Sequence, residues 1–325
     1  MERWSSNVIW RWLVLAIWLI VSVNGLLIKS PGVLEAVELP QGTNLSLSDA
    51  TNLGTPIPKE FRADIVRQEK TFNVLNFYLN AIHLVWWESI YPFFASSEGD
   101  TGQFKKPPRI SVTPSQAVYP HLQHCHVVWT LVKIAEDCFA THDYREIKTN
   151  ILYKLRSGWN ELGTLLVEEG QPKDVLAPDQ GAESSLYEGA HPGASDTPST
   201  MNDDKMDIQT GFLHNGKKLQ STNVFLTVIR AIAVLAEEDS NMEISTWQFV
   251  DITTNVKVKM SAAAGVSLKI TVGNVAEALK YMAQDMVVSK RFVEMIAIYS
   301  LSNPKKVEYG SVMILKDEAA GIEVS

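Results

Sequence analysis

Similar stretches recur in the same order in two parts of this sequence, and this repetition constrains the fold more than any other feature. Residues 161–169 read ELGTLLVEE, and residues 308–316 read EYGSVMILK. Both begin with Glu, a large apolar residue, Gly and a small hydroxyl residue, and both continue with apolar residues. The first residues of the two stretches are 147 positions apart (308 − 161).

Three further pairs of stretches follow the same order, with offsets between 145 and 160 residues. They are 73–88 with 223–238, 110–113 with 270–273, and 151–157 with 296–302. One such pair can arise by chance, but four collinear pairs indicate an internal duplication. We therefore predict two related halves, over residues 59–169 and 206–318.

The segments outside the two halves have a different composition. Residues 170–205 are rich in Pro, Gly, Ser and acidic residues and contain hardly any large apolar residue. Such a segment cannot bury enough apolar surface to offset the entropy cost of ordering, which predicts a disordered linker. Residues 26–58 are similarly polar and predict a weakly ordered N-terminal segment, and residues 319–325 form a short tail.

Residues 1–25 have the pattern of a secretory signal peptide. Arg3 and Arg11 precede an apolar run over 12–23, and Gly25 is small enough for the cleavage position. The run is shorter than the roughly 20 residues that span a bilayer. We therefore expect cleavage after Gly25 and a secreted, extracellular protein. The alternative is a protein of the secretory pathway that is anchored in the membrane by an uncleaved N-terminal segment.

Two features bear on the chemistry of the secretory pathway. Asn44 begins the sequon Asn-Leu-Ser, which predicts N-glycosylation if the chain is secreted. The only two cysteines are Cys125 and Cys138, both within a predicted helix. Thirteen helical residues separate the two sulfurs by about 20 Å, whereas a disulfide needs Cα atoms within about 7 Å. We therefore predict two free, buried thiols.

The charge of the chain narrows the range of partners. Its formal net charge is −8, and its isoelectric point is about 5.4. A general nucleic-acid binder needs clustered Lys and Arg to neutralise phosphates, so we expect no nucleic-acid partner. We also expect no membrane partner unless the N-terminal segment stays uncleaved. Hydrophobic residues make up 46% of the 325 residues, which is enough for a substantial core.

The hydrophobic periodicity alternates between helices and strands in both halves. For the first half it predicts helices over 71–92 and 120–139, a strand over 109–113, and a hairpin of 149–155 with 162–168. For the second half it predicts helices over 221–239, capped by Ser221 or Thr222, and over 274–288, strands over 256–260 and 266–272, and a hairpin of 293–301 with 306–315. The segments 61–67 and 206–213 would each add an opening strand.

This order of elements predicts an α+β fold in which the helices of each half pack on one face of a mainly antiparallel sheet. The order approaches the ferredoxin-like split β-α-β arrangement with an extra strand. Joining the edges of the two sheets into one continuous sheet would hide their exposed edges. A cleft shared by the two halves is the natural place for a ligand.

The stretch HLQHCH at 121–126 contains the residues that most resemble a metal site. On a helix, His121 and Cys125 are one turn apart, and His124 lies beside Cys125, so the three side chains have ligand types that zinc prefers. The helix is apolar around most of its circumference, however, with a polar strip of His126, Thr130, Lys133 and Asp137. Packing of Cys125 as a small hydrophobic residue is the better interpretation. We predict no metal and no cofactor.

Other catalytic signatures are absent from the sequence. Cys138 and His142 are four residues apart, but His142 falls past the predicted helix end and no orienting Asn or Asp can be assigned. The sequence has no nucleophile elbow, zinc-protease motif, phosphate-binding loop or dinucleotide fingerprint. Whether the protein is an enzyme therefore stays open at this stage.

Aromatic residues gather at the end of the first predicted helix. Trp87 falls opposite the apolar stripe and beside His83, and Tyr91 and Phe93 follow the helix. If these four side chains are exposed, they form a ligand or partner surface. Burial against the rest of the protein is the alternative.

Three hypotheses for the function follow. The leading one is a secreted protein that binds a protein or a small ligand, with contacts from His83, Trp87, Tyr91 and Phe93. The second is an extracellular hydrolase with a site between the two halves, for which the groups to check are His83, His121, His124 and Asp137. The third is a signal-anchored protein of the secretory pathway.

Overall fold

The computed structural model describes residues 50–51, 57–99, 101–102, 106–115, 121–170, 208–263, 269–301 and 308–317. The predicted signal peptide, the sequon at Asn44 and the C-terminal tail lie outside these residues. Nearly all of the predicted linker and most of the N-terminal segment also lie outside them. The structure therefore tests the two halves.

The described residues of each half form two long helices and a sheet. The first half contains β2 (Phe61–Thr71), α2 (Val74–Ser89), β3 (Thr101–Gly102), β4 (Arg109–Pro114), α3 (His124–Thr141), β5 (Arg145–Leu155) and β6 (Gly158–Glu168). The second half contains β7 (Ile208–Lys218), α4 (Ser221–Leu235), β8 (Glu243–Ile244), β9 (Thr246–Asp251), β10 (Val256–Ala262), β11 (Ile270–Thr271), α5 (Val272–Ser289), β12 (Val293–Leu301) and β13 (Glu308–Lys316). The short strand β1 (Ala50–Thr51) pairs in parallel with β9.

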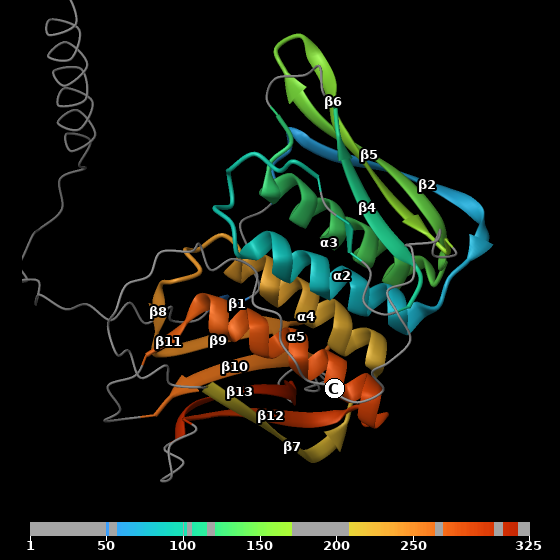
Figure 1. Ribbon diagram of the computed structural model, residues 1–325. Helices are drawn as coiled ribbons and strands as arrows, with labels where there is room; N and C mark the ends of the chain where they lie inside the picture. Colours follow the sequence, from blue (N-terminus) through green and yellow to red (C-terminus); the bar gives the residue numbers. More distant parts are fainter. Residues whose placement is uncertain are drawn as a thin grey trace, which may run out of the picture. The chain divides into compact units, whose positions relative to one another are not determined.

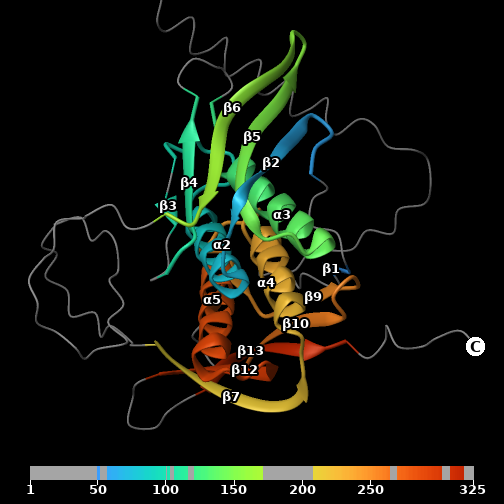
Figure 2. The same ribbon diagram turned by 90° about the vertical axis from the view of Figure 1, so that its right-hand side faces the viewer.

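The two larger sheets lie on opposite sides of a double layer of helices (Figures 1 and 2), and β8 and β11 form a separate two-stranded sheet. Helices α2 and α3 face the first sheet and α4 and α5 face the second, while α2 contacts both α4 and α5 and α3 contacts α4. Tyr78 of α2 stacks on Phe225 of α4 with ring centroids 5.8 Å apart. The prediction of one continuous sheet is therefore wrong, because the helices have a second apolar side that must also be buried, and packing helix on helix buries it.

The strand order is the same in the two halves. The first sheet has the order β2-β5-β6-β4-β3, and the second contains the equivalent order β7-β12-β13-β10-β9 with β1 at its end. All pairings except β1 with β9 are antiparallel. Consequently β4-α3-β5 is a split β-α-β unit with β6 between its strands, and β10-α5-β12 is its counterpart around β13. The predicted α+β class with two repeated halves is confirmed.

The glycines of the two similar stretches occupy equivalent places. Gly163 lies in β6 and Gly310 in β13. A Cβ at Gly163 would lie 2.7 Å from the Thr113 carbonyl oxygen, and one at Gly310 would lie 2.9 Å from the Ser261 carbonyl oxygen. Both oxygens belong to the neighbouring strand, β4 or β10. The repeated glycine is therefore required by a close approach of two strands.

A helix-to-loop hydrogen bond is also repeated. The Asn76 Nδ2 donates to the Pro107 carbonyl at 3.0 Å, and the Asn223 Nδ2 donates to the Thr254 carbonyl at 2.8 Å. In each pair the second half is offset by 147 residues (223 − 76 and 254 − 107). The side chain near the start of the first helix thus holds the segment that leads into β4 in the first half and into β10 in the second.

The opening strand and the second helix of each half are joined by an equivalent side-chain pair. Arg67 of β2 pairs with Asp137 of α3, and His214 of β7 lies 2.6 Å from Asp285 of α5. The offsets are 147 (214 − 67) and 148 (285 − 137). An acidic helix residue paired with a basic strand residue therefore recurs at the same place in the fold.

Some of the predicted correspondences are wrong in register. In the structure, Asn223 of the second half is equivalent to Asn76 and not to Asn73. Asn73 instead caps α2, and its side chain accepts a hydrogen bond from the Asn76 N–H. The pairing of 110–113 with 270–273 is wrong, because the former is β4 and the latter spans β11 and the start of α5. The helical period explains the first error, since a shift of three residues keeps similar faces aligned.

Several element boundaries also differ from the prediction. Helix α3 begins at His124, so His121 lies outside it. The N-cap of α4 is Gln220 and makes no side-chain cap hydrogen bond. The described part of the predicted strand 266–272 contains only Ile270 and Thr271 as strand residues, and β9 was not predicted.

Candidate functional site

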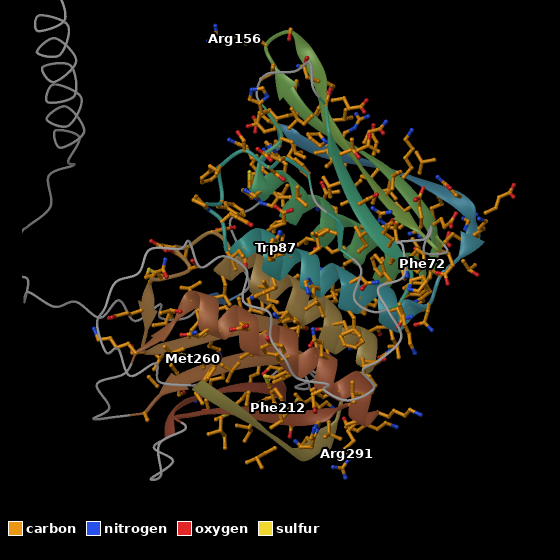
Figure 3. The ribbon with its side chains drawn as sticks, in the orientation of Figure 1. Phe72, Trp87, Arg156, Phe212, Met260 and Arg291 are labelled. Atoms are coloured by element: carbon orange, nitrogen blue, oxygen red, sulfur yellow. The ribbon has the colours of Figure 1, made fainter. Side chains whose placement is uncertain are left out.

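The aromatic residues at the C-terminal end of α2 are divided between surface and core. Tyr91 is 39% exposed and Phe94 is 68% exposed, whereas Phe93 is buried. Trp87, half-buried, lies near the same end of the helix (Figure 3). We call Trp87, Tyr91 and Phe94 the aromatic surface. Sequence reasoning missed Phe94, although it directly follows Phe93 in the same aromatic run.

The aromatic surface is held by a buried pair behind it. The Tyr91 ring stacks on the His124 ring with centroids 4.8 Å apart and planes 9° apart. His124 Nδ1 lies 2.5 Å from Oε2 of Glu88, whose side chain is fully buried. The Trp87 ring meets the Tyr91 ring edge-on at 5.9 Å. Tyr91 therefore presents one face to His124 and is oriented by the first turn of α3.

The loop that carries Tyr91 and Phe94 is attached to the start of α3 by hydrogen bonds. The Gln123 Nε2 donates to the Phe94 carbonyl at 2.7 Å, and the Cys125 N–H donates to the Phe93 carbonyl at 2.8 Å. Phe93 packs against Trp129 with ring centroids 5.8 Å apart. Phe93 thus supports the aromatic surface from inside and does not belong to it.

His83 lies one helical turn before Trp87, where α2 meets α5. Its ring meets the Trp86 ring at 5.6 Å. The Lys280 Nζ lies 3.0 Å from the centroid of the Trp86 ring and 4.4 Å from that of Tyr281. Burial lowers the pKa of Lys280 to about 8. Burial, with the nearby charge of Lys280, also lowers the pKa of His83.

The candidate metal ligands lie in different environments. His121 is exposed and precedes α3, His124 pairs with Glu88, and Cys125 is buried. Burial raises the pKa of the Cys125 thiol to about 12. Among the described residues, no group of three or more His, Cys, Asp or Glu side chains could hold a metal ion.

The polar strip predicted for this helix is largely buried. His126 and Thr130 are almost inaccessible, while Lys133 is exposed and Asp137 half-buried. His126 and Thr130 are buried because α3 lies between the first sheet and the other helices. The Thr130 hydroxyl is satisfied by donating to the His126 carbonyl at 2.7 Å.

Both cysteines are free and buried, as predicted. Burial raises the pKa of the Cys138 thiol to about 11, although the nearby Arg67 guanidinium lowers it in part. His142 is the C-cap of α3, and its backbone N–H donates to the Cys138 carbonyl at 3.0 Å. A thiol with a raised pKa is protonated at neutral pH and is a poor nucleophile.

Two of the groups named in the hydrolase hypothesis, His124 and Asp137, do not converge. His124 and Asp137 lie thirteen residues apart on the same helix (137 − 124), which separates them by about 20 Å. Asp137 pairs with Arg67 of β2. His83 is placed on α2 and faces Lys280 of α5.

A cleft of about 600 Å³ lies between α3 of the first half and α4 and β9 of the second. Its apolar lining comes from both halves: Ile57, Trp129, Val132, Ala233, Val234, Phe249 and Ile252. Its polar lining consists of Lys133, Glu136, Arg230, Glu237, Asp251 and Thr253. The volume lies within the range of small-molecule sites. A cleft shared by the two halves is thus present.

Arg230 joins the two halves inside this cleft. Its Nε and Nη2 donate to Glu136 Oε1 at 3.1 and 2.9 Å, and its Nη1 donates to both Asp251 carboxylate oxygens at 2.9 Å. These carboxylates and the accompanying hydrogen bonds raise the pKa of Arg230 in spite of its burial. Sequence reasoning missed Arg230, although it is the one charged residue between Ser221 and Ala236.

Comparisons with known proteins assign no family. No family model matches the sequence, and no curated protein matches it. One similar solved structure is the tandem DUF26 ectodomain of a cysteine-rich receptor-like protein from Arabidopsis thaliana. It is 6% identical, the match covers 78% of this chain and 96% of that one, and the TM-score is 0.22. At this TM-score we transfer no property from that protein.

One property relevant to membranes follows from the helices. Among the residues that the structure describes, no helix combines the length and the apolar character needed to cross a bilayer.

Proposed function

We propose that this protein is a secreted interaction protein that binds a protein partner through the aromatic surface of Trp87, Tyr91 and Phe94. The observation that carries the proposal is the exposure of Tyr91 and Phe94, at 39% and 68%, beside a half-buried tryptophan. Exposed aromatic clusters are typical of partner-binding surfaces, because tyrosine and tryptophan bury large areas with few rotatable bonds. His83, one turn away on α2, borders the surface.

The second half supports the proposal because it has the same fold without these aromatic residues. Trp87 corresponds to Val234 of α4, with an offset of 147 (234 − 87). The segment after α4, residues 236–242, reads AEEDSNM and contains no aromatic residue. The same fold thus forms in the second half without these aromatic residues, which favours a role for them beyond folding.

The rigid support of the surface also favours binding. Tyr91 is stacked on His124, and the loop is tied to α3 by backbone hydrogen bonds. Ordering a side chain at an interface costs roughly 0.5–1.5 kcal/mol, and a side chain that is already oriented avoids part of this cost. Secretion is supported by the signal-peptide pattern of residues 1–25.

The test compares partner recovery from the extracellular medium by three immobilised proteins. These are the wild type, a Tyr91→Ser/Phe94→Ser double variant, and a Trp159→Ser control, whose tryptophan is 41% exposed at the β5–β6 hairpin. The hairpin tip, marked by Arg156 in Figure 3, is far from the end of α2. After crosslinking, we expect the wild type and the control to recover the same partner protein. The double variant should not recover it. Recovery by the double variant at the wild-type level would contradict the proposal.

A further inference from the structure

The two ends of the helix layer form equivalent seams between the halves. Helices α2 and α5 meet at one seam, and their counterparts α4 and α3 meet at the other. On the seam of α2 and α5, Trp86 contacts Lys280. Trp86 corresponds to Ala233 (233 − 86 = 147), and Lys280 corresponds to Val132 (280 − 132 = 148). The same two positions therefore carry large side chains at one seam and small ones at the other.

This difference in size explains the cleft. Val132 and Ala233 both line it. At the opposite seam, the indole of Trp86 and the long side chain of Lys280 occupy the equivalent positions, and Lys280 is only 4% exposed there. The seam of α3 and α4 is thus open because its side chains are too short to fill it.

The filled seam shows what chemistry fits this geometry. Its occupant is an ammonium group on an aliphatic chain, placed over the rings of Trp86 and Tyr281. An ammonium beside an aromatic face is attracted by the ring quadrupole. The open cleft also has aromatic walls, provided by Trp129 and Phe249.

The charges of the cleft favour the same chemistry. Its lining holds two cations, Lys133 and Arg230, and three carboxylates, a sum of −1. The Arg230 guanidinium already donates to two of these carboxylates, Glu136 and Asp251. An incoming anion must therefore compete with bound carboxylates, whereas a cation meets the excess negative charge.

We infer that the cleft between α3, α4 and β9 binds a small organic ammonium ion that carries an apolar chain or ring. The apolar part would lie against Trp129, Val132 and Ala233, and the ammonium would lie toward the carboxylates. This site is separate from the aromatic surface, so failure of either proposal leaves the other intact.

The experiment measures the affinities of three probes of equal size, phenylbutylammonium, phenylbutanol and phenylbutyrate, for the folded protein by calorimetry at neutral pH. We expect the ammonium to bind at least about tenfold more tightly than the carboxylate, a difference of about 1.4 kcal/mol, because the excess negative charge attracts the cation and repels the anion. Equal or tighter binding of phenylbutyrate, or no binding of any probe, would overturn the inference.

Two variants locate the site. Ile252→Arg adds a cation at a cleft residue that is 66% exposed, and Val288→Arg adds one to a residue of α5 that is 69% exposed and does not line the cleft. We expect Ile252→Arg to weaken ammonium binding at least about tenfold by repulsion, and Val288→Arg to leave it within about twofold. Ala233→Trp should abolish binding of all three probes by rebuilding the filled seam. An unchanged ammonium affinity in Ile252→Arg would place the site elsewhere and refute the inference.

Discussion

His126 should make the stability of this protein sensitive to acid, because its side chain accepts a hydrogen bond that caps a helix. The second half has the same cap with an acceptor that does not titrate. The His126 Nδ1 accepts the Gln123 backbone N–H at 3.1 Å at the start of α3. In α5 the equivalent acceptor is Asn274 Oδ1, 3.0 Å from the Thr271 N–H (274 − 126 = 148). A protonated imidazole cannot accept this hydrogen bond. The variant His126→Asn keeps a cap acceptor and removes the titration.

The expected size follows from the pKa. Burial lowers the pKa of His126 to about 4, from an ordinary value of 6.5. Acid therefore protonates the unfolded chain first. The stability from His126 is complete above about pH 6.5 and is lost as the pH falls toward 4. At pH 5 the loss is about 2 kcal/mol, because protonation shifts the folding equilibrium toward the unfolded state roughly thirtyfold.

The assay is urea unfolding at pH 7 and pH 5 for the wild type and His126→Asn. The smaller side chain loses contacts with Phe61 and Trp129, so the variant should be less stable than the wild type by about 1 kcal/mol or more at pH 7. Between the two pH values it should lose about 2 kcal/mol less than the wild type. His142→Asn, at the exposed left-handed cap of α3, should behave as the wild type does. Equal losses in the wild type and His126→Asn would refute the reasoning.

The remaining predictions concern the strand contact, the buried lysine and the N-terminus. In urea titrations, Gly163→Ala and Gly310→Ala should each lower the free energy of unfolding by about 1–3 kcal/mol through overpacking. Gly211→Ala is the control, because a Cβ there meets no atom within 4 Å, and it should change the free energy of unfolding little. Because burial lowers the pKa of Lys280 to about 8 from 10.5, wild-type stability should rise between those pH values relative to Lys280→Met, and parallel pH profiles would contradict this. N-terminal sequencing of the purified protein should begin at Leu26, and an intact first residue would favour the anchored alternative.

The repeated α+β architecture could be predicted because both periodicities and the punctuating glycines are local signals. Gly163 lies within β6 and Gly310 within the equivalent strand β13, and the similar stretches around them identified the duplication. The hairpins were recognised because their turns interrupt two apolar runs. The alignment of the helices of one half with those of the other could not be predicted, since apolar faces in a helix match again after a shift of three residues. The hydrogen bonds of Asn76 and Asn223 determine the register of α2 and α4.

The candidate sites were harder to predict because they depend on contacts between distant segments. Phe93 and Phe94 are neighbours in the sequence, and only the hydrogen bonds of the loop to α3 decide which of them points inward. Arg230 pairs with Glu136, a residue 94 positions away in the other half. A lone charge in an apolar helix indicates a buried partner, but it does not identify the partner.

The duplication separates what the fold requires from what each half has acquired. Where the two halves carry equivalent contacts, as in Arg67–Asp137 and His214–Asp285, the contact joins the same strand and helix in both. Where they differ, the fold tolerates either side chain, so the difference needs another cause. Trp87 against Val234 is a difference of this kind. Substitutions at shared contacts should therefore act mainly on unfolding, and substitutions at divergent positions mainly on binding.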